Sequence, residues 1–281
     1  MLIQSGHRDG IGNDFRGSVR IYYRMLSSTF IHAPGIGATT EQGLWKQGAL
    51  TWSHLLETPD SFKVPLSRRA GLIKTVEASV EMLQNRRVDY FAGLLPSREH
   101  WRGVRDFPKI GFLDIETDGG MSGDSITLIG LGDGFDVKIY VKDVDLPAFA
   151  YECQEYDGFV TFFGGGFDLP MLQRRFPVLQ NVFSDRLHVD LCPLLRRLGY
   201  KGGLKSIERQ LKINRVPETD GLSGLDAVRL WDIYRRGRTG SDEAFQLLLA
   251  YNREDVVNMK LLLDFAFPKL TEASGWQGGL V

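Results

Sequence analysis

The sequence contains few of the features that mark secreted or membrane-spanning proteins. Only two of its 281 residues are cysteines, Cys153 and Cys192, which is too few for a disulfide framework or a cysteine-based zinc site. No apolar run approaches the roughly 18 residues that a membrane-spanning helix needs. The first ten residues include His7, Arg8 and Asp9 and lack the apolar core of a signal peptide. We therefore expect a cytoplasmic globular protein that does not associate with membranes.

The chain also has almost no net charge, because 34 Lys and Arg residues balance 35 Asp and Glu residues. The local distribution is uneven. Residues 111–190 contain 14 acidic and 5 basic side chains, whereas residues 61–110 contain 5 acidic and 10 basic ones. An acidic middle beside a basic flank is typical of a site that collects cations while its rim attracts an anion. The acids can equally lie in solvated turns, so charge alone does not identify a nucleic-acid-binding protein.

The pattern of apolar residues divides the chain into four regions. We expect a poorly ordered arm over 1–27, a helical region over 28–107, a mixed α/β domain over 108–267 and a tail over 268–281. The helical region contains a long amphipathic stretch at 67–94, which predicts a single helix there.

Three short apolar stretches separated by Gly and Asp turns open the α/β domain. They lie at 110–117, 125–131 and 135–141 and predict an antiparallel meander. Strand and helix patterns alternate after it, which predicts parallel strands, and a final long helix is expected over 241–267. The predicted fold class is therefore α/β, with a mixed sheet of antiparallel and parallel strands flanked by helices.

Two carboxylates lie in the first predicted strand of this domain. Because side chains alternate along a strand, Asp114 and Glu116 point to one face, and Leu113 and Ile115 point to the other. A strand with apolar residues on both faces is usually interior, where a carboxylate is costly unless another group compensates its charge. The alternative is a strand that ends at Asp114 and leaves both acids exposed.

A third acid, Asp168, follows a run of three glycines. The strand predicted near 158–163 leads into Gly164–Gly166, and Asp168 opens the next helix. Glycines at such a place allow the backbone to approach another group closely. An aspartate at a helix N-terminus can also be a simple cap, so Asp168 taken alone favours a structural role.

A fourth acid lies on the final helix. Spacings of three and four residues place Leu248, Tyr251, Asp255 and Met259 on one stripe, and Asp255 is the only charged residue in it. A lone carboxylate in a stripe that faces the core should be paired with a cation or bound to a metal. If its role is structural, one of the nearby arginines, such as Arg253, is its expected partner.

Several longer segments add to these motifs. They are FLDIETDG (112–119), FGGGFDLPML (163–172), HVDLCPLLRRLG (188–199), GLKSIERQL (203–211) and LLAYNREDVVNM (248–259). In this order they resemble the DEDD exonuclease superfamily in its tyrosine variant, and more widely the YprB-type ribonuclease-H-like domains, over about residues 108–266. The resemblance implies a ribonuclease-H-like sheet. One departure is Phe163, since exonucleases of this group usually have asparagine five residues before the second-motif aspartate.

The resemblance also implies an activity and its residues. Asp114, Glu116, Asp168 and Asp255 would bind two divalent cations, and Tyr251 would hydrogen-bond the attacking water or the scissile phosphate. Sites made of carboxylates favour Mg²⁺ or Mn²⁺ over zinc, and the sequence has no cluster of His or Cys. The implied function is a 3′–5′ exonuclease that hydrolyses phosphodiester bonds of DNA or RNA by a two-metal mechanism.

Some basic residues of the α/β domain are candidates for binding the phosphates of a nucleic acid. They are Arg174, Arg175, Lys205 and Arg209. Arginine and lysine make many of the phosphate contacts in complexes with nucleic acids, and these contacts position the strand without reading its sequence. Each of the four can equally lie on a solvated helix face and contact nothing.

The N-terminal region offers a second candidate for phosphate binding, in the turn Pro34–Gly37. This turn is similar to a helix–hairpin–helix element, in which backbone N–H groups at Gly35 and Gly37 would bind a phosphate. The alternative is a plain turn between helices that packs Trp45 and Trp52.

Two other functions are compatible with parts of the sequence. A non-catalytic nucleic-acid-binding module would keep the fold, and Phe163 agrees with it, but the four intact acids argue against it. A phosphatase of the aspartyl-phosphate type is suggested by DIETDG, which is similar to an Asp-x-Asp-x-Thr motif. Glu116 replaces the second aspartate of that motif, and Tyr251 and Asp255 would have no role in such an enzyme.

Overall fold

A five-stranded mixed sheet forms the centre of the computed structural model, which describes residues 24–277. Its strands are β1 (Ile110–Thr117), β2 (Ile126–Gly132), β3 (Val137–Val141), β4 (Gly158–Thr161) and β5 (Leu187–Asp190). The order across the sheet is β3-β2-β1-β4-β5. β1, β2 and β3 form an antiparallel meander, and β4 and β5 run parallel to β1. The mixed sheet predicted from the sequence is confirmed.

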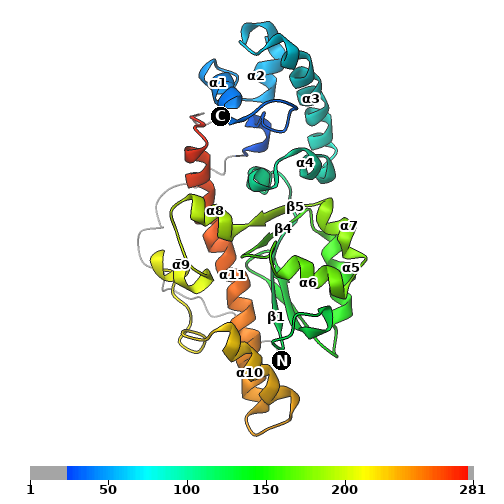
Figure 1. Ribbon diagram of the computed structural model, residues 1–281, viewed down its shortest axis with the longest axis vertical. Coiled ribbons are helices and arrows are strands. Elements are labelled where there is room, and N and C mark those ends of the chain that lie inside the picture. Colours follow the sequence, from blue (N-terminus) through cyan, green and yellow to red (C-terminus); the bar gives the residue numbers. More distant parts are fainter. Residues whose placement is uncertain (1–23, 278–281) are drawn as a thin grey trace.

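Helices cover both faces of this sheet and form the N-terminal region (Figure 1). They are α1 (Ala38–Lys46), α2 (Trp52–Glu57), α3 (Leu66–Gln84), α4 (Val88–Leu94), α5 (Phe149–Glu152), α6 (Asp168–Arg175), α7 (Leu179–Ser184), α8 (Leu191–Arg197), α9 (Leu204–Gln210), α10 (Gly224–Arg235) and α11 (Ser241–Ala273). α11 lies along one face of the sheet, and α5, α6 and α7 cover the other (Figure 1). No helix within residues 24–277 is both long and apolar enough to cross a membrane.

The two faces of β1 belong to different hydrophobic cores. Leu113 and Ile115 pack with residues of α5, α6 and α7, whereas Phe112 packs in the core that contains the inner face of α11. Gly130 of β2 allows α11 to come close, because a Cβ atom at this position would lie only 2.3 Å from Oδ1 of Asn252 on α11. The middle of α11 is therefore held directly above the strand that carries Asp114 and Glu116.

α11 continues to Ala273, beyond the end expected at residue 267. The expectation was wrong because Pro268, which lacks a backbone N–H and normally ends a helix, lies inside this one. Burial of Leu270 and Thr271 on the following turn compensates for the lost hydrogen bond. The described part of the expected tail is therefore mostly helix, and Nε2 of Gln42 on α1 donates to the Ser274 carbonyl at 2.9 Å.

The N-terminal region differs from the sequence expectation in two places. The single helix expected over 67–94 is two helices, α3 and α4, because Arg86 takes a left-handed backbone conformation with φ of 52° between them. Residues 1–23 of the expected arm lie outside the described residues. The arm was expected to extend to residue 27, but its last residues belong to the folded region, since Met25 and Leu26 are completely buried in the main core.

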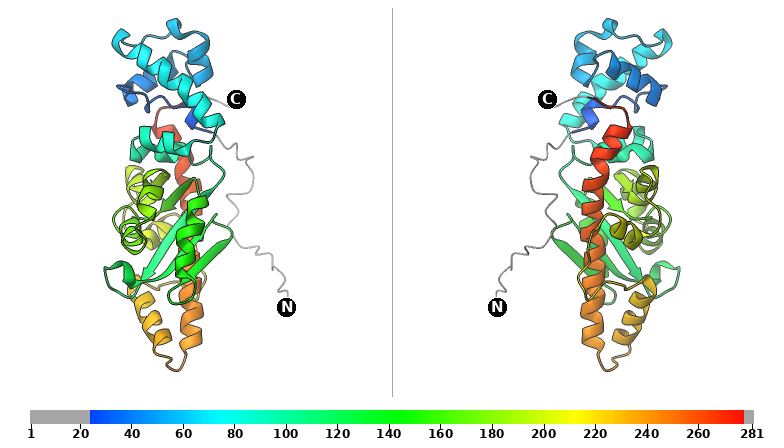
Figure 2. Two further views of the ribbon diagram at one scale, coloured as in Figure 1. Left: turned by 90° about the vertical axis from the view of Figure 1, so that its right-hand side faces the viewer. Right: turned by 90° about the vertical axis from the view of Figure 1, so that its left-hand side faces the viewer.

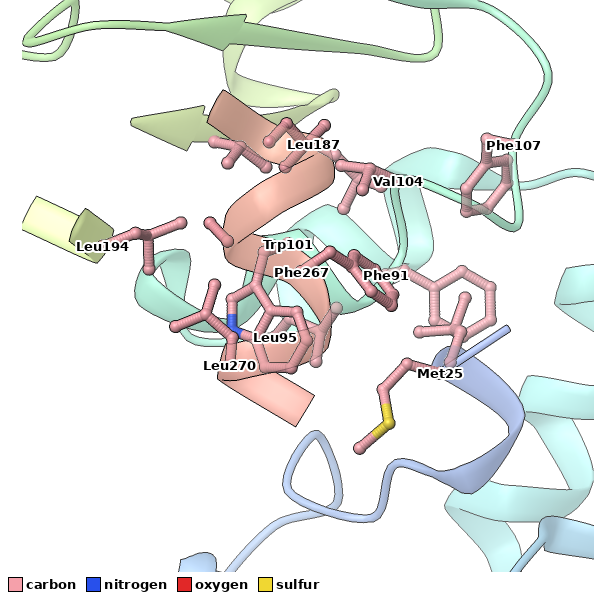
Figure 3. Packing of buried hydrophobic residues seen from close by; sticks show 14 of the residues in the cluster. Met25, Phe91, Leu95, Trp101, Val104, Phe107, Leu187, Leu194, Phe267 and Leu270 are labelled. Atoms are coloured by element: carbon pink, nitrogen blue, oxygen red, sulfur yellow. The ribbon is translucent and has the colours of Figure 1, made fainter. Parts of the chain in front are cut away.

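The N-terminal region and the sheet share one hydrophobic core. Trp101, from the 3₁₀ segment Ser97–Arg102, packs edge-on against Phe267 of α11, with the ring centroids 5.4 Å apart. Figure 3 shows these two rings together with Leu95 and Leu270, and with Leu187 of β5 on the sheet side. The molecule is elongated, with α1, α2 and α3 at one end and α10 at the other (Figure 2).

A buried ion network connects the segment before α1 to this core. Arg102 is 2% exposed, and its guanidinium donates to Glu41 at 2.9 Å and to Glu99 at 2.8 Å. The other carboxylate oxygen of Glu41 accepts the backbone N–H groups of Phe30 and Ile31, at 2.6 and 3.0 Å. One arginine thus holds the segment before α1 against the 3₁₀ segment that leads to the sheet.

The turn at Pro34–Gly37 is followed by a helix, but it is not preceded by an α-helix within the described residues. α1 begins after Gly37, and before the turn only the 3₁₀ turn at Leu26–Ser28 and irregular chain are present. The helix–hairpin–helix interpretation is therefore wrong for its first helix. The indole N–H groups of Trp45 and Trp52 donate to the carbonyls of Ser28 and Thr29, at 2.8 and 2.7 Å, so both tryptophans fix the chain before the turn.

Replacing Arg102 with methionine should lower the free energy of unfolding by about 3–5 kcal/mol, because it leaves the buried carboxylate of Glu41 without a cation and removes the closest cation of Glu99, which Arg197 contacts at 3.5 Å. Urea unfolding of the Arg102→Met variant tests this. Arg69→Met is the matched control, since its partner Asp60 is 91% exposed and such a pair contributes at most about 1 kcal/mol. Equal losses in the two variants would contradict a stabilising role for the network.

Candidate metal centre

Three of the predicted acids meet where α11 crosses β1. Asp114 and Glu116 of β1 and Asp255 of α11 each offer a carboxylate oxygen, and these three atoms lie within 4.8 Å of one another. Glu116 and Asp255 are buried, and Asp114 is partly buried. The alternative of a strand ending at Asp114 with exposed acids is wrong, since β1 continues to Thr117.

Asp168 stands beside this triad without belonging to it. It is the first residue of α6, and its Oδ1 accepts the N–H of Ile115 at 3.2 Å, between the two acids of β1. The residue at the cap position is Phe167, so Asp168 does not have the simple cap role that the sequence also allowed. Its charge helps to raise the pKa values of Asp114 and Glu116, as expected of a carboxylate close to them.

The electrostatics of the four acids are those of a site with too little positive charge to balance them. Burial, and then repulsion from the neighbouring carboxylates, raises the pKa values of Asp114 and Glu116 well above their usual range. Burial is also the main cause that raises the pKa of Asp168 to about 7 and that of Asp255 to about 6. A divalent cation would remove this penalty, and a donor set made only of carboxylate oxygens fits Mg²⁺ or Mn²⁺.

Asp255 has a cationic partner that the sequence did not reveal. Nη2 of Arg215, which follows α9, donates to Asp255 and to Glu208, and Nε of Arg215 donates to the second oxygen of Glu208 at 2.7 Å. The expected partner, Arg253, donates instead to the carbonyl of Val137 at 2.9 Å. Arg215 lies in a loop without apolar periodicity, so no sequence pattern connected it with the last helix.

Tyr251 lies one helical turn before Asp255, as predicted, and is buried. Nζ of Lys205 on α9 donates to its hydroxyl at 2.6 Å and lies 3.9 Å from the centre of its ring. Burial and the nearby carboxylates raise the pKa of Tyr251, so the hydroxyl stays protonated. Lys205, one of the candidate phosphate contacts, is thus part of the centre.

Asn252 is a second residue of the centre that the sequence did not indicate. Its Nδ2 donates to Oδ2 of Asp114 at 2.8 Å, which connects α11 directly to β1. Asn252 lies beside the stripe formed by Tyr251 and Asp255, so the helical spacing did not select it. The only sequence signal was its place in the segment LLAYNREDVVNM.

The other candidates for nucleic-acid binding lie further out. Arg174 donates to the carbonyl of Met121 at 3.0 Å and Arg175 pairs with Asp124 at 3.1 Å, so both brace the loop after β1. Arg209 is exposed and lines, together with Lys205 and Arg215, a cavity of about 490 Å³ beside α9. Gly35 and Gly37 precede α1, at the opposite end of the molecule from α10 (Figure 1).

The match to a family model agrees with the fold. The sequence model described as RNase_H superfamily matches residues 111–266. The solved structure of the family B DNA polymerase from the hyperthermophilic archaeon Pyrobaculum calidifontis is similar, with a TM-score of 0.48 and 16% sequence identity. The similarity covers 60% of this chain and 26% of the polymerase chain, so the chain spans about a quarter of the length of that polymerase. No curated protein matches the chain.

Without metal, the free energy of unfolding should fall as the pH rises from about 4 to about 7. The pKa values of the four acids are higher in the folded state than in the unfolded state, so the folded state binds more protons in this pH range. Raising the pH therefore favours the unfolded state, which releases its protons more easily. Mn²⁺ or Mg²⁺ should flatten this slope, because it binds the ionised carboxylates. Thermal unfolding across this pH range, with EDTA or with Mn²⁺, measures both effects.

A slope that is the same with and without the cation would contradict the metal centre. Asp106 is the internal reference for this experiment, because burial raises its pKa to about 7 as well. It lies before β1, and its carboxylate accepts the N–H of Leu26 in the N-terminal region. The contribution of Asp106 to the pH dependence of the free energy of unfolding should therefore remain when the cation is added.

Proposed function

This chain belongs to the RNase_H superfamily, whose sequence model matches more than half of it, and we propose that it is a metal-dependent nuclease. More specifically, we propose a 3′–5′ exonuclease of the tyrosine DEDD type that acts on DNA or RNA. The observation that carries this proposal is the convergence of Asp114, Glu116 and Asp255 within 4.8 Å, with Asp168 beside them.

The four carboxylates would bind the divalent cations. Two cations held by Asp114, Glu116, Asp168 and Asp255 would activate a water and stabilise the leaving oxygen when bound. Arg215 contacts one oxygen of Asp255, which leaves the other free to bind a cation. Arg215 would thus fix the orientation of this carboxylate, as Asn252 would fix that of Asp114.

Tyr251 and Lys205 would position the reacting groups. The protonated hydroxyl of Tyr251 accepts a hydrogen bond from Lys205, so its own proton is free to be donated to a phosphate oxygen or to the attacking water. The ammonium group of Lys205 lies where it would offset part of the negative charge of a bound phosphate. Neither residue would need to change its protonation state during the reaction.

Replacing Asp114 with asparagine should abolish hydrolysis and leave the fold intact, because the amide keeps the shape of the side chain but loses its charge. The metal-free variant should be slightly more stable than the parent, since one repelling carboxylate is removed. The activity is measured on end-labelled single- and double-stranded DNA and RNA with Mn²⁺. Asp124→Asn is the matched control, because Asp124 is an 85% exposed acid in the loop after β1. Unchanged turnover in Asp114→Asn would contradict catalysis at this centre, and no hydrolysis by the parent protein would indicate a binding module without activity.

Replacing Tyr251 with phenylalanine should lower the rate by roughly 10–10³-fold, the scale expected when one aligning hydrogen bond is lost. Affinity for Mn²⁺ should stay nearly constant, because all four carboxylates remain. Single-turnover rates and Mn²⁺ titrations on the same preparation separate the two effects. Tyr234→Phe provides the control, as Tyr234 stacks on Phe245 between α10 and α11. A parental rate in Tyr251→Phe would mean that Tyr251 only fills the core.

A further inference from the structure

Phe163 is the exposed member of an aromatic loop beside the metal centre. The loop between β4 and α6 contains three phenylalanines, of which Phe162 and Phe167 pack against the two cores while Phe163 is 53% exposed. Single exposed apolar side chains are common, so exposure alone does not indicate a function. The backbone conformation of Phe163 is more informative than its exposure.

The backbone of Phe163 is held in an unfavourable conformation. Its φ of 64° lies in the left-handed region, which a bulky side chain rarely adopts. Such a conformation persists only where the surroundings enforce it, and here Asp190 does so. Its carboxylate accepts the N–H of Phe163 at 2.8 Å and that of Gly165 at 3.2 Å, besides capping α8 through the N–H of Cys192 at 3.1 Å.

The glycines of the loop leave room for the ring. A Cβ atom at position 166 would lie 2.9 Å from Cζ of Phe163, so the far end of the ring rests against the backbone of Gly166. A Cβ atom at position 164 would lie 2.3 Å from Oγ1 of Thr161, which is buried and hydrogen-bonded to His188. The ring therefore contacts Gly166 on one side, while about half of Phe163 is exposed to solvent.

We propose that Phe163 is a stacking platform for the base next to the scissile phosphate of a single-stranded nucleic acid, an inference that rests on the proposed nuclease function. The N–H of Leu169, the neighbour of Asp168, donates to the carbonyl of Gly164 at 2.9 Å, so the backbone beside Phe163 lies against the start of α6 and close to Asp168. A strand whose phosphate is held by the cations and Lys205 would bring an unpaired base to this side of the centre. Stacking on an aromatic ring accepts any base, because every base has an apolar face.

The test compares strands with and without the stacked base. Phe163→Gly removes the ring but keeps the backbone, since glycine adopts the left-handed conformation without steric strain. It should lower kcat/KM roughly 10-fold on a single-stranded DNA with a normal 3′ end, the effect of losing one stacked base. Two further strands are abasic, one at the terminal and the other at the penultimate nucleotide. The parent and the variant should cleave one of these two strands equally fast, because that strand lacks the base that stacks on Phe163.

Two control variants sharpen this experiment. Phe163→Trp keeps an aromatic face and should retain the parental kcat/KM on normal strands. Phe135→Gly removes another exposed phenylalanine, in the turn between β2 and β3, and should change nothing. Equal losses of Phe163→Gly on normal strands and on both abasic strands, or no loss on any strand, would overturn the stacking role.

Failure of the nuclease proposal can be recognised separately. If the parent protein cleaves no nucleic acid, the proposed function is wrong, and stacking is then measured by binding alone. A single-stranded DNA with 2-aminopurine at its 3′ end is titrated with protein in the presence of Ca²⁺. Stronger quenching of its fluorescence by the parent than by Phe163→Gly supports the platform, and equal quenching overturns it.

Discussion

The close approach of α11 to the sheet is the constraint on which the rest of the structure depends. Gly130 has no side chain to separate the helix from β2, and Asn252 occupies the space that a Cβ atom would need. A larger residue there would push α11 outward, and the carboxylate of Asp255 would move away from Asp114 and Glu116. Because a cation needs its ligands at fixed distances, packing of the helix and chemistry of the site cannot be separated.

The buried acids create a second constraint, which is electrostatic. Burial of four carboxylates at one point is unfavourable, and the fold compensates only part of it within the described residues. Arg215 pairs with Asp255, but it also pairs with Glu208, so much of its charge is already neutralised. Lys205 donates to a neutral tyrosine and to a backbone carbonyl. The negative charge that remains is the physical basis for binding a divalent cation there.

The parts of this site that follow regular periodicities could be predicted from the sequence. Alternation along β1 placed Asp114 and Glu116 on one face, and helical spacing placed Tyr251 one turn before Asp255. The rest depends on tertiary contacts. Arg215 lies in a loop whose path is set by its own buried ion pairs, and the continuation of α11 past Pro268 is stabilised by burial against the N-terminal region. A single sequence shows which residues lie on one face, but it does not show which loops cover that face.

The length of α11 determines what the N-terminal region can contribute to the reaction. Asp255 lies in the middle of this helix, and Phe267, twelve residues further on, packs against Trp101 in the shared core. At 1.5 Å per residue, this contact lies about 18 Å from the metal centre. The N-terminal helices lie beyond it (Figure 1), and Arg102 and Glu41 hold them in place. α1, α2 and α3 therefore lie too far away to supply a group to the reaction, but they can bind a distant part of a long substrate or stabilise the end of α11.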